Sequence, residues 1–153
     1  MADGQRTAFV MVCNKDGSLM MLKQRKNKDM KCESVEMGIS EPCRENEDYK
    51  DAALRGLKLA LGADGSKVEK MQQMFVFPYE ESCSSSSRGC LFTVEVDCQL
   101  QPADKYEAVE FWACERSQQA MENNEFAPLW ATIWKIFYGE TLSRLAGSEF
   151  DIF

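Results

Sequence analysis

The chain has 153 residues and a mass of 17.4 kDa, a size that suits one compact domain with a sizeable core. Its net charge of −7 and isoelectric point near 4.7 exclude the broad basic face expected of a protein that binds extended nucleic acid. No apolar run approaches the ~18 residues of a membrane span, and the first residues lack the build of a signal peptide. We therefore expect an intracellular, cytoplasmic protein that does not act at a membrane.

The cysteines predict neither a zinc site nor a disulfide framework. The seven cysteines form an odd set without a C-x-x-C pair, and the sequence has no histidine. Most of them fall in apolar, strand-like runs, which indicates small buried side chains rather than reactive thiols. Cys43 and Cys83 lie in polar, loop-like segments and are the exceptions. The absence of histidine also removes the commonest general acid or base near neutral pH.

The chain begins with a predicted β-hairpin. Residues 7–13 and 18–24 are apolar runs, and the segment Asn14-Lys15-Asp16-Gly17 between them is a turn sequence. Residues 33–39 alternate more weakly in polarity and predict a third strand.

Residues 48–61 predict a helix, because their apolar side chains recur at intervals of three and four. Acidic residues crowd the start of this segment, and Gly62 follows it where a C-terminal cap glycine belongs. Gly56 in the interior costs the helix about 1 kcal/mol relative to alanine. Either packing tolerates this glycine or a close approach of another segment requires it.

The second half of the chain predicts three strands and two helices. Residues 74–79 and 90–96 are β-rich and flank a flexible hairpin tip, and residues 107–112 alternate before a helix at 116–122. A strongly apolar helix follows at 126–138. Several aromatic residues here could stack a nucleobase, but their spacing favours a core role: Trp112, Phe126, Trp130, Trp134, Phe137 and Tyr138. The end of the chain, at 148–153, suits an edge strand, a docking motif or a terminal segment packed on its own domain.

The segment from Asn46 to Ala63 resembles the signature of the Nudix family, Gly-x5-Glu-x7-Arg-Glu-U-x-Glu-Glu-x-Gly-U, where U is aliphatic. The match places the family's first glutamate, arginine, aliphatic residue and closing glycine on four residues without a gap: Glu47, Arg55, Leu57 and Gly62. The later glutamates fall on residues without a carboxylate: Gly56, Leu59 and Ala60. The opening glycine is replaced by Glu41, and the nearest glycine is Gly38. The chain thus resembles a Nudix domain with a degenerate signature.

Further landmarks of the family follow in order along the chain. Residues 19–26 are similar to the Nudix strand that ends in a Gln-Arg tract, residues 90–96 to a central strand, and residues 106–112 to the strand that leads into a short helix. Residues 126–128 resemble the start of the last helix. The resemblance implies an α/β/α sandwich with a mixed sheet between helices, in one domain of residues 1–153 with a core at 7–138 and a C-terminal tail at 139–153.

Nudix relatives hydrolyse nucleoside diphosphate-linked compounds with divalent cations that their glutamates hold, and this chain keeps only Glu47 of that set. We therefore predict no catalytic residue, no metal ligand and no cofactor, with Mg²⁺ or Mn²⁺ required only if the chain is an active, divergent hydrolase. An improvised metal site from the acids before the helix is the alternative, although such acids ordinarily form a solvated helix start: Glu41, Glu45, Glu47, Asp48 and Asp51. Glu107 and Glu110 are expected to be outward-facing strand positions.

Residues 23–31 contain five of the chain's 18 basic residues, so this basic tract is locally positive in an acidic chain. By the resemblance it could meet substrate phosphates, whereas the plain alternative is an exposed, solubilising loop. The substrate-binding candidates are Arg25, Lys26, Lys28, Glu47 and Arg55.

Three functional hypotheses follow. The leading one is a domain without metal-dependent diphosphate hydrolysis that binds a nucleotide or diphosphate ligand or a protein partner. The second is an active diphosphohydrolase that uses carboxylates outside the signature. The third is a structural or protein-interaction domain with a vestigial cleft.

Overall fold

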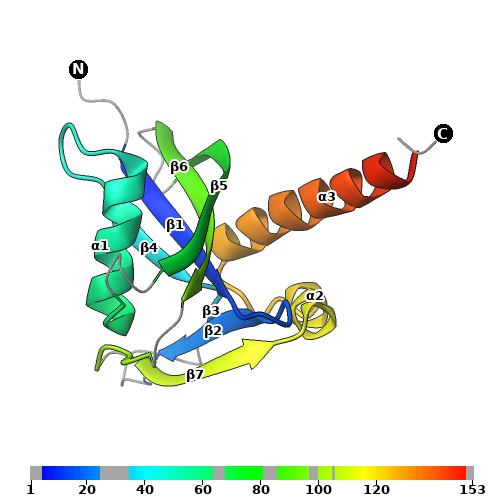
Figure 1. Ribbon diagram of the computed structural model, residues 1–153, viewed down its shortest axis with the longest axis horizontal. Coiled ribbons are helices and arrows are strands. Elements are labelled where there is room, and N and C mark those ends of the chain that lie inside the picture. The colour runs from blue at the N-terminus through cyan, green and yellow to red at the C-terminus, as the bar shows by residue number, and fades with distance from the viewer. Residues whose placement is uncertain are drawn as a thin grey trace.

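The computed structural model describes residues 5–24, 35–63, 68–80, 86–96, 100–104 and 106–150. Figure 1 shows their arrangement. The elements, in chain order, are β1 (Arg6–Cys13), β2 (Leu19–Gln24), β3 (Val35–Glu36), β4 (Ile39–Pro42), α1 (Tyr49–Leu61), β5 (Val68–Glu80), β6 (Ser86–Val96), β7 (Tyr106–Trp112), α2 (Cys114–Glu122) and α3 (Pro128–Phe150).

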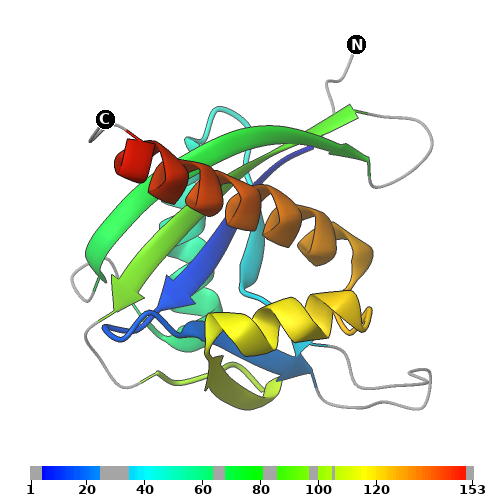
Figure 2. The same ribbon diagram turned by 90° about the vertical axis from the view of Figure 1, so that its right-hand side faces the viewer.

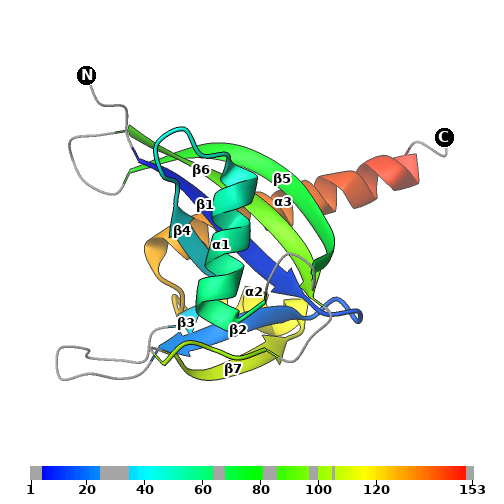
Figure 3. The same ribbon diagram turned by 60° about the vertical axis from the view of Figure 1, so that its left-hand side comes forward.

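These strands form a mixed sheet that splays at one end. β1 pairs parallel with β6 along its whole length, while β6 with β5, β1 with β4 and β2 with β7 are antiparallel. The register of β1 and β2 joins only Cys13 to Leu19, beside the turn that links these strands. The ribbon of β2 and β7 therefore diverges from β1 and β6 (Figure 3).

Helices cover both faces of the sheet, and alternation along β1 explains why. Ala8, Val10 and Val12 belong to the core beneath α1, whereas Phe9 and Met11 belong to the core beneath α2 and α3. Figures 1 and 2 show α1 on one side of the strands and the other two helices on the opposite side. The predicted α/β/α sandwich with a mixed sheet is confirmed.

The first hairpin and α1 match the sequence closely. Gly17 closes the β1–β2 turn with a φ of 90°, and Ser18 N–H donates to Asn14 Oδ1 at 2.9 Å. α1 ends at Leu61 and is capped by Gly62, whose φ of 71° is left-handed. The N–H of Gly62 donates to the carbonyl oxygen of Lys58 at 2.9 Å, and the N–H of Ala63 donates to that of Leu57 at 3.4 Å. The predicted C-terminal cap is therefore confirmed.

The third predicted strand is instead two short strands. β3 ends at Glu36 and β4 begins at Ile39, with a bend between them. The backbone at Gly38 passes so close to β1 that an added Cβ would lie 2.0 Å from the carbonyl oxygen of Val10. Only a glycine allows this approach, so the alternating pattern is interrupted there.

Two other boundaries differ from the prediction. β5 continues to Glu80 and β6 begins at Ser86, so the strands take up much of the expected hairpin tip at 80–89. α3 continues to Phe150 and takes up most of the segment predicted as a tail. The helix excludes the edge strand at 148–150, which was one of the interpretations of the segment 148–153, and residues 151–153 lie outside the described residues. Gly139 does not stop the helix, since an interior glycine costs only about 1 kcal/mol.

The aromatic residues fulfil the core role that their spacing favoured. Trp112, Phe126, Trp130 and Trp134 are buried beneath α2 and α3. Phe9 is central to this layer, because its ring lies 5.5 to 5.7 Å from the rings of Phe77, Tyr79 and Trp130. No described helix is long and apolar enough to cross a membrane.

The described cysteines are unpaired, as predicted: Cys13, Cys43, Cys90 and Cys114. Burial raises the pKa of the Cys43 thiol, which argues against the reactive role left open for it. Cys83 lies outside the described residues.

Replacing Phe9 by alanine should lower the free energy of unfolding by about 3–5 kcal/mol, because it opens a cavity among three aromatic rings. Val76→Ala is the control, since Val76 is 49% exposed and its truncation should change stability by no more than about 0.5 kcal/mol. Urea denaturation followed by circular dichroism measures both. A similar small loss for both variants would contradict the described core.

Candidate functional site

Arg55 organises the turn between β4 and α1, the segment that carries the signature resemblance. Its Nη2 donates to the carbonyl oxygen of Pro42 at 2.7 Å, and its Nε donates to Glu41 Oε2 at 3.1 Å. Its Nη1 donates to Glu47 Oε2. One side chain of the helix thus holds the end of β4 and the loop that follows.

Glu47 holds the same loop from the other side. Its Oε1 accepts a hydrogen bond from Arg44 N–H at 2.8 Å, and the intervening Asn46 has a left-handed φ of 62°. The hydrogen bond from the backbone of Arg44 and the nearby Arg55 guanidinium lower the pKa of the Glu47 carboxyl. Glu47 is therefore a carboxylate at neutral pH and part of a fixed turn.

The structure brings together two of the sequence-predicted site residues, Glu47 and Arg55, and pairs them with each other. Their side chains are only 16% and 17% exposed. These contacts give both residues a structural role, and ligand binding by either one stays a prediction. Arg25, Lys26 and Lys28 lie outside the described residues.

Position 56 shows why the helix carries a glycine. A Cβ added to Gly56 would lie 2.9 Å from Glu41 Cβ and 3.2 Å from Ile39 Cγ2. A close approach of β4 therefore requires this glycine, which resolves the alternative that the sequence left open. The Glu41 side chain fills the space into which a residue at position 56 would extend.

The other two replaced positions of the signature differ from each other. Leu59 is 64% exposed, so its apolar side chain faces solvent, whereas Ala60 is buried in the core beneath α1. Gly56, Leu59 and Ala60 therefore offer a metal ion no oxygen ligand at the three positions where the resemblance places carboxylates.

The residues present do not fit a divalent cation. Mg²⁺ binds through hard oxygen ligands, and the two nearest half-buried carboxylates, Glu41 and Glu47, are both paired with Arg55. Across the described ranges no three His, Cys, Asp or Glu residues gather closely enough to hold a metal ion. Glu45, Asp48 and Asp51 are exposed, which agrees with a solvated helix start.

Lys23 is the member of the basic tract that the structure describes, and it forms an ion pair. Its Nζ lies 2.7 Å from Oε2 of Glu110, and this contact lowers the pKa of the Glu110 carboxyl. Glu107 is exposed as expected, but Glu110 is half-buried rather than outward-facing. Sequence reasoning missed the pair, because it depends on the pairing of β2 with β7.

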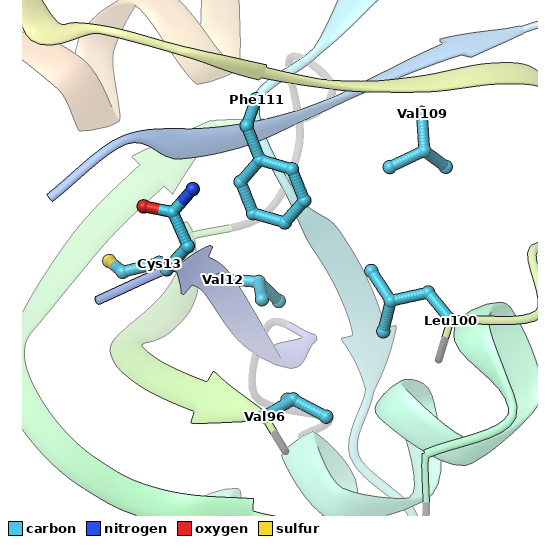
Figure 4. Close-up of a pocket in the computed structure, with 7 residues that line it drawn as sticks. Val12, Cys13, Val96, Leu100, Val109 and Phe111 are labelled. Carbon is cyan, nitrogen blue, oxygen red and sulfur yellow. The ribbon is translucent and has the colours of Figure 1, made fainter. Parts of the chain in front are cut away.

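A cavity of about 330 Å³ lies at the end of β1 and was not predicted (Figure 4). Its lining is mostly apolar and comes from β1, β6, β7 and the segment around Leu100. The sequence gives no local signal for it, because its walls meet only through the sheet pairing.

No family model matches the chain, and no curated protein is similar enough in sequence to count as a relative. Several solved structures match it in fold. A MutT protein from Methanosarcina mazei Go1 has a TM-score of 0.64 and 12% identity, over 92% of this chain and 98% of that one. A C. elegans Ap4A hydrolase in a binary complex has a TM-score of 0.60 and 12% identity, over 91% and 98%. The Nudix domain of Shewanella oneidensis NrtR, complexed with ADP ribose, has a TM-score of 0.56 and 11% identity, over 78% and 79%.

The chain has the Nudix fold. At these identities the likeness concerns the fold alone, so it assigns no role to any side chain. The degenerate Nudix signature therefore still depends on the alignment of Glu47, Arg55, Leu57 and Gly62 in the sequence.

The close approach of β4 to Gly56 can be tested by placing a carboxylate on the helix. Gly56→Glu should lower the free energy of unfolding by about 2 kcal/mol, because it crowds Glu41 and Ile39. Adding Glu41→Gly frees that space, so the double variant should show a favourable coupling of about 1 kcal/mol or more in a double-mutant cycle. Leu59→Glu is the control on the same helix and should cost no more than about 0.5 kcal/mol. Additive effects of the paired changes would refute the close approach.

The carboxylate of Glu47 should make stability depend on pH. Its folded pKa lies below its ordinary value of 4.5, so its contribution is present above that value and is lost as the pH falls through the folded pKa. Glu47→Gln should therefore be less stable than the unmodified chain at pH 7, with a gap that narrows as the pH falls below 4.5 and through the lowered folded pKa. Urea titrations across this range measure the gap, and a gap that does not change with pH would contradict the role of the charge.

Proposed function

We propose that this chain is a Nudix-fold binding protein that takes up a phosphate-bearing, nucleotide-like ligand and does not catalyse metal-dependent diphosphate hydrolysis. One observation carries the proposal: the face of α1 that the resemblance equips with carboxylates has Gly56, Leu59 and Ala60 instead. The nearest remaining acids are engaged by Arg55. Hydrolysis would need a cation to neutralise the charge of the diphosphate. The residues at positions 56, 59 and 60 have no oxygen atoms in their side chains with which to bind that cation.

The nature of the ligand follows from the fold and from the charge pattern. One solved structure of the same fold is a complex with ADP ribose. The basic tract at 23–31 offers cations that can attract phosphate groups without metal. We propose Arg25, Lys26 and Lys28 as phosphate contacts, and Arg55 with Glu47 as the part of the binding surface that shapes the loop before α1. We also propose that the protein works in the cytoplasm.

Two alternatives stay open. Glu41 puts a carboxylate beside position 56, which favours an active, divergent hydrolase if Arg55 releases it. The second alternative is a structural or protein-interaction module, which the absence of ligand binding would favour.

Ligand binding and catalysis can be measured separately. ADP-ribose, nucleoside diphosphates and cap analogues should be screened by thermal shift with EDTA and with Mg²⁺, and at least one should raise the Tm equally in both conditions. The same compounds should yield no nucleoside monophosphate or phosphate in a Mg²⁺-supplemented assay. Metal-dependent turnover of any of them would overturn the proposal, and no shift with the whole panel would favour the interaction module.

The place of the ligand can be tested with two exposed apolar residues. Leu59→Glu adds a negative charge to the proposed binding face, whereas Val76→Glu adds the same charge on β5. Leu59→Glu should weaken binding of an anionic ligand about tenfold in calorimetry, because the new carboxylate repels phosphate. Val76→Glu should leave binding within about twofold. Equal effects of both changes would place the ligand elsewhere.

A further inference from the structure

The cavity beside β1 has walls from three strands that are distant in sequence. It encloses about 330 Å³ and is lined by Val12, Cys13, Asn14, Val96, Leu100, Val109 and Phe111. Figure 4 shows the side chains of Phe111 and Val109, from β7, together with Leu100 around the space next to Val12. None of the lining residues comes from α1 or from the turn that Arg55 holds.

The cavity exists because the sheet opens at this point. The register of β1 and β2 joins only Cys13 to Leu19. β7 pairs with β2, so β7 leaves the plane of β1 and β6 together with it. Leu100 closes one side, because the next residue, Gln101, donates its N–H to the carbonyl oxygen of Leu61 at the end of α1. The opening is therefore part of the fold rather than a packing defect.

The lining favours an uncharged occupant. Among the residues that the structure describes, the lining contains no Asp, Glu, Lys or Arg, so none of them would compensate a buried ionic group. Cys13 is the lining residue of this described set that has a titratable side chain. Burial, together with Glu95 and Cys114, raises its pKa to about 11, so the thiol stays neutral at physiological pH.

Two lining residues supply directional contacts. The ring of Phe111 is 41% exposed and can stack with, or meet the edge of, a second ring. Asn14 is held by the hydrogen bond from Ser18 N–H to its Oδ1. No described residue accepts a hydrogen bond from its Nδ2, so this amide can donate to an acceptor on a bound ring.

We infer that this cavity is a binding site for an uncharged, planar aromatic group with a hydrogen-bond acceptor on its edge. The volume is at the lower end of the range for small-molecule sites, about 300 to 1,000 Å³, which suits one fused ring system. Hydrophobic side chains surround the faces of the ring, and the amide of Asn14 meets its edge. The site is separate from the face of α1 and does not depend on the function proposed for it.

Binding can be tested with the full chain and three probes of similar size. Benzimidazole has a ring and an acceptor, indole has a ring without an acceptor, and 1-hexanol is aliphatic. Titration at pH 7.5, followed by backbone amide NMR, should show saturable shifts at Asn14, Val109 and Phe111 with benzimidazole, at a dissociation constant of about 1 mM or tighter. Indole should bind about three- to tenfold more weakly, since it leaves the Asn14 donor without a partner.

Equal binding of 1-hexanol would overturn the assignment to an aromatic ligand. The absence of saturable shifts with benzimidazole would overturn the site itself. Concentration-dependent dimerisation that places the same amides in an interface would assign the cavity to a second copy of the chain, and would also overturn the inference.

Two variants check the location. Val109→Phe fills the cavity and should weaken benzimidazole binding at least tenfold, whereas Val76→Phe, on exposed β5 surface, should leave it unchanged. If Val109→Phe does not fold, Phe111→Ala gives the same test, because it removes a ring that is 41% exposed. It should weaken benzimidazole about fivefold or more by removing the ring contact. Unchanged binding in the folded variant would overturn the inference.

Discussion

The guanidinium of Arg55 is the constraint on which the site depends, because it has three protein acceptors at once. It reaches the end of β4 at Pro42 O and Glu41, and the loop at Glu47. Two acceptors belong to the end of β4 and the third to the loop before α1, so the contacts fix how α1 leaves the sheet. The same contacts occupy the two half-buried carboxylates nearest the helix. The geometry that preserves the turn therefore removes the acids that a cation would need.

Glu41 and Gly56 are coupled by their close approach, because a Cβ on residue 56 would lie 2.9 Å from the Cβ of Glu41. The resemblance places a glycine at position 41 and a glutamate at position 56, and this chain has the two residue types reversed. The Cβ of Glu41 lies where a side chain on residue 56 would begin, so only one of these positions can carry a large side chain. In this chain the carboxylate of the pair is on the strand, at Glu41, where Arg55 binds it. This exchange keeps the turn packed and leaves α1 without a ligand for metal.

The elements that the sequence predicted best depend on local chemistry. Gly17 and Gly62 have left-handed φ values in the positions expected of a turn and a helix cap, and both are readable from neighbouring residues. The bend at Gly38 was missed, because it depends on the carbonyl of Val10 in another strand. In the site, the resemblance at fixed spacing identified Glu47 and Arg55 as candidates, but their pairing with each other was found only in the structure. The Lys23–Glu110 pair and the cavity require the register of β2 with β7, which no local pattern gives.

The turn before α1 and the cavity at the end of β1 are two independent features of the fold. The turn held by Arg55 is polar and internally paired, whereas the cavity at the end of β1 is apolar and has no wall residue from α1. The first depends on ion pairs near the helix, and the second on the divergence of β7 from β1. Because the two features rest on separate contacts, substitutions on the face of α1 can change that face without altering the cavity. Under the proposed function, the Nudix fold of this chain therefore combines a helix face without carboxylates with a separate apolar cavity that is formed by the sheet.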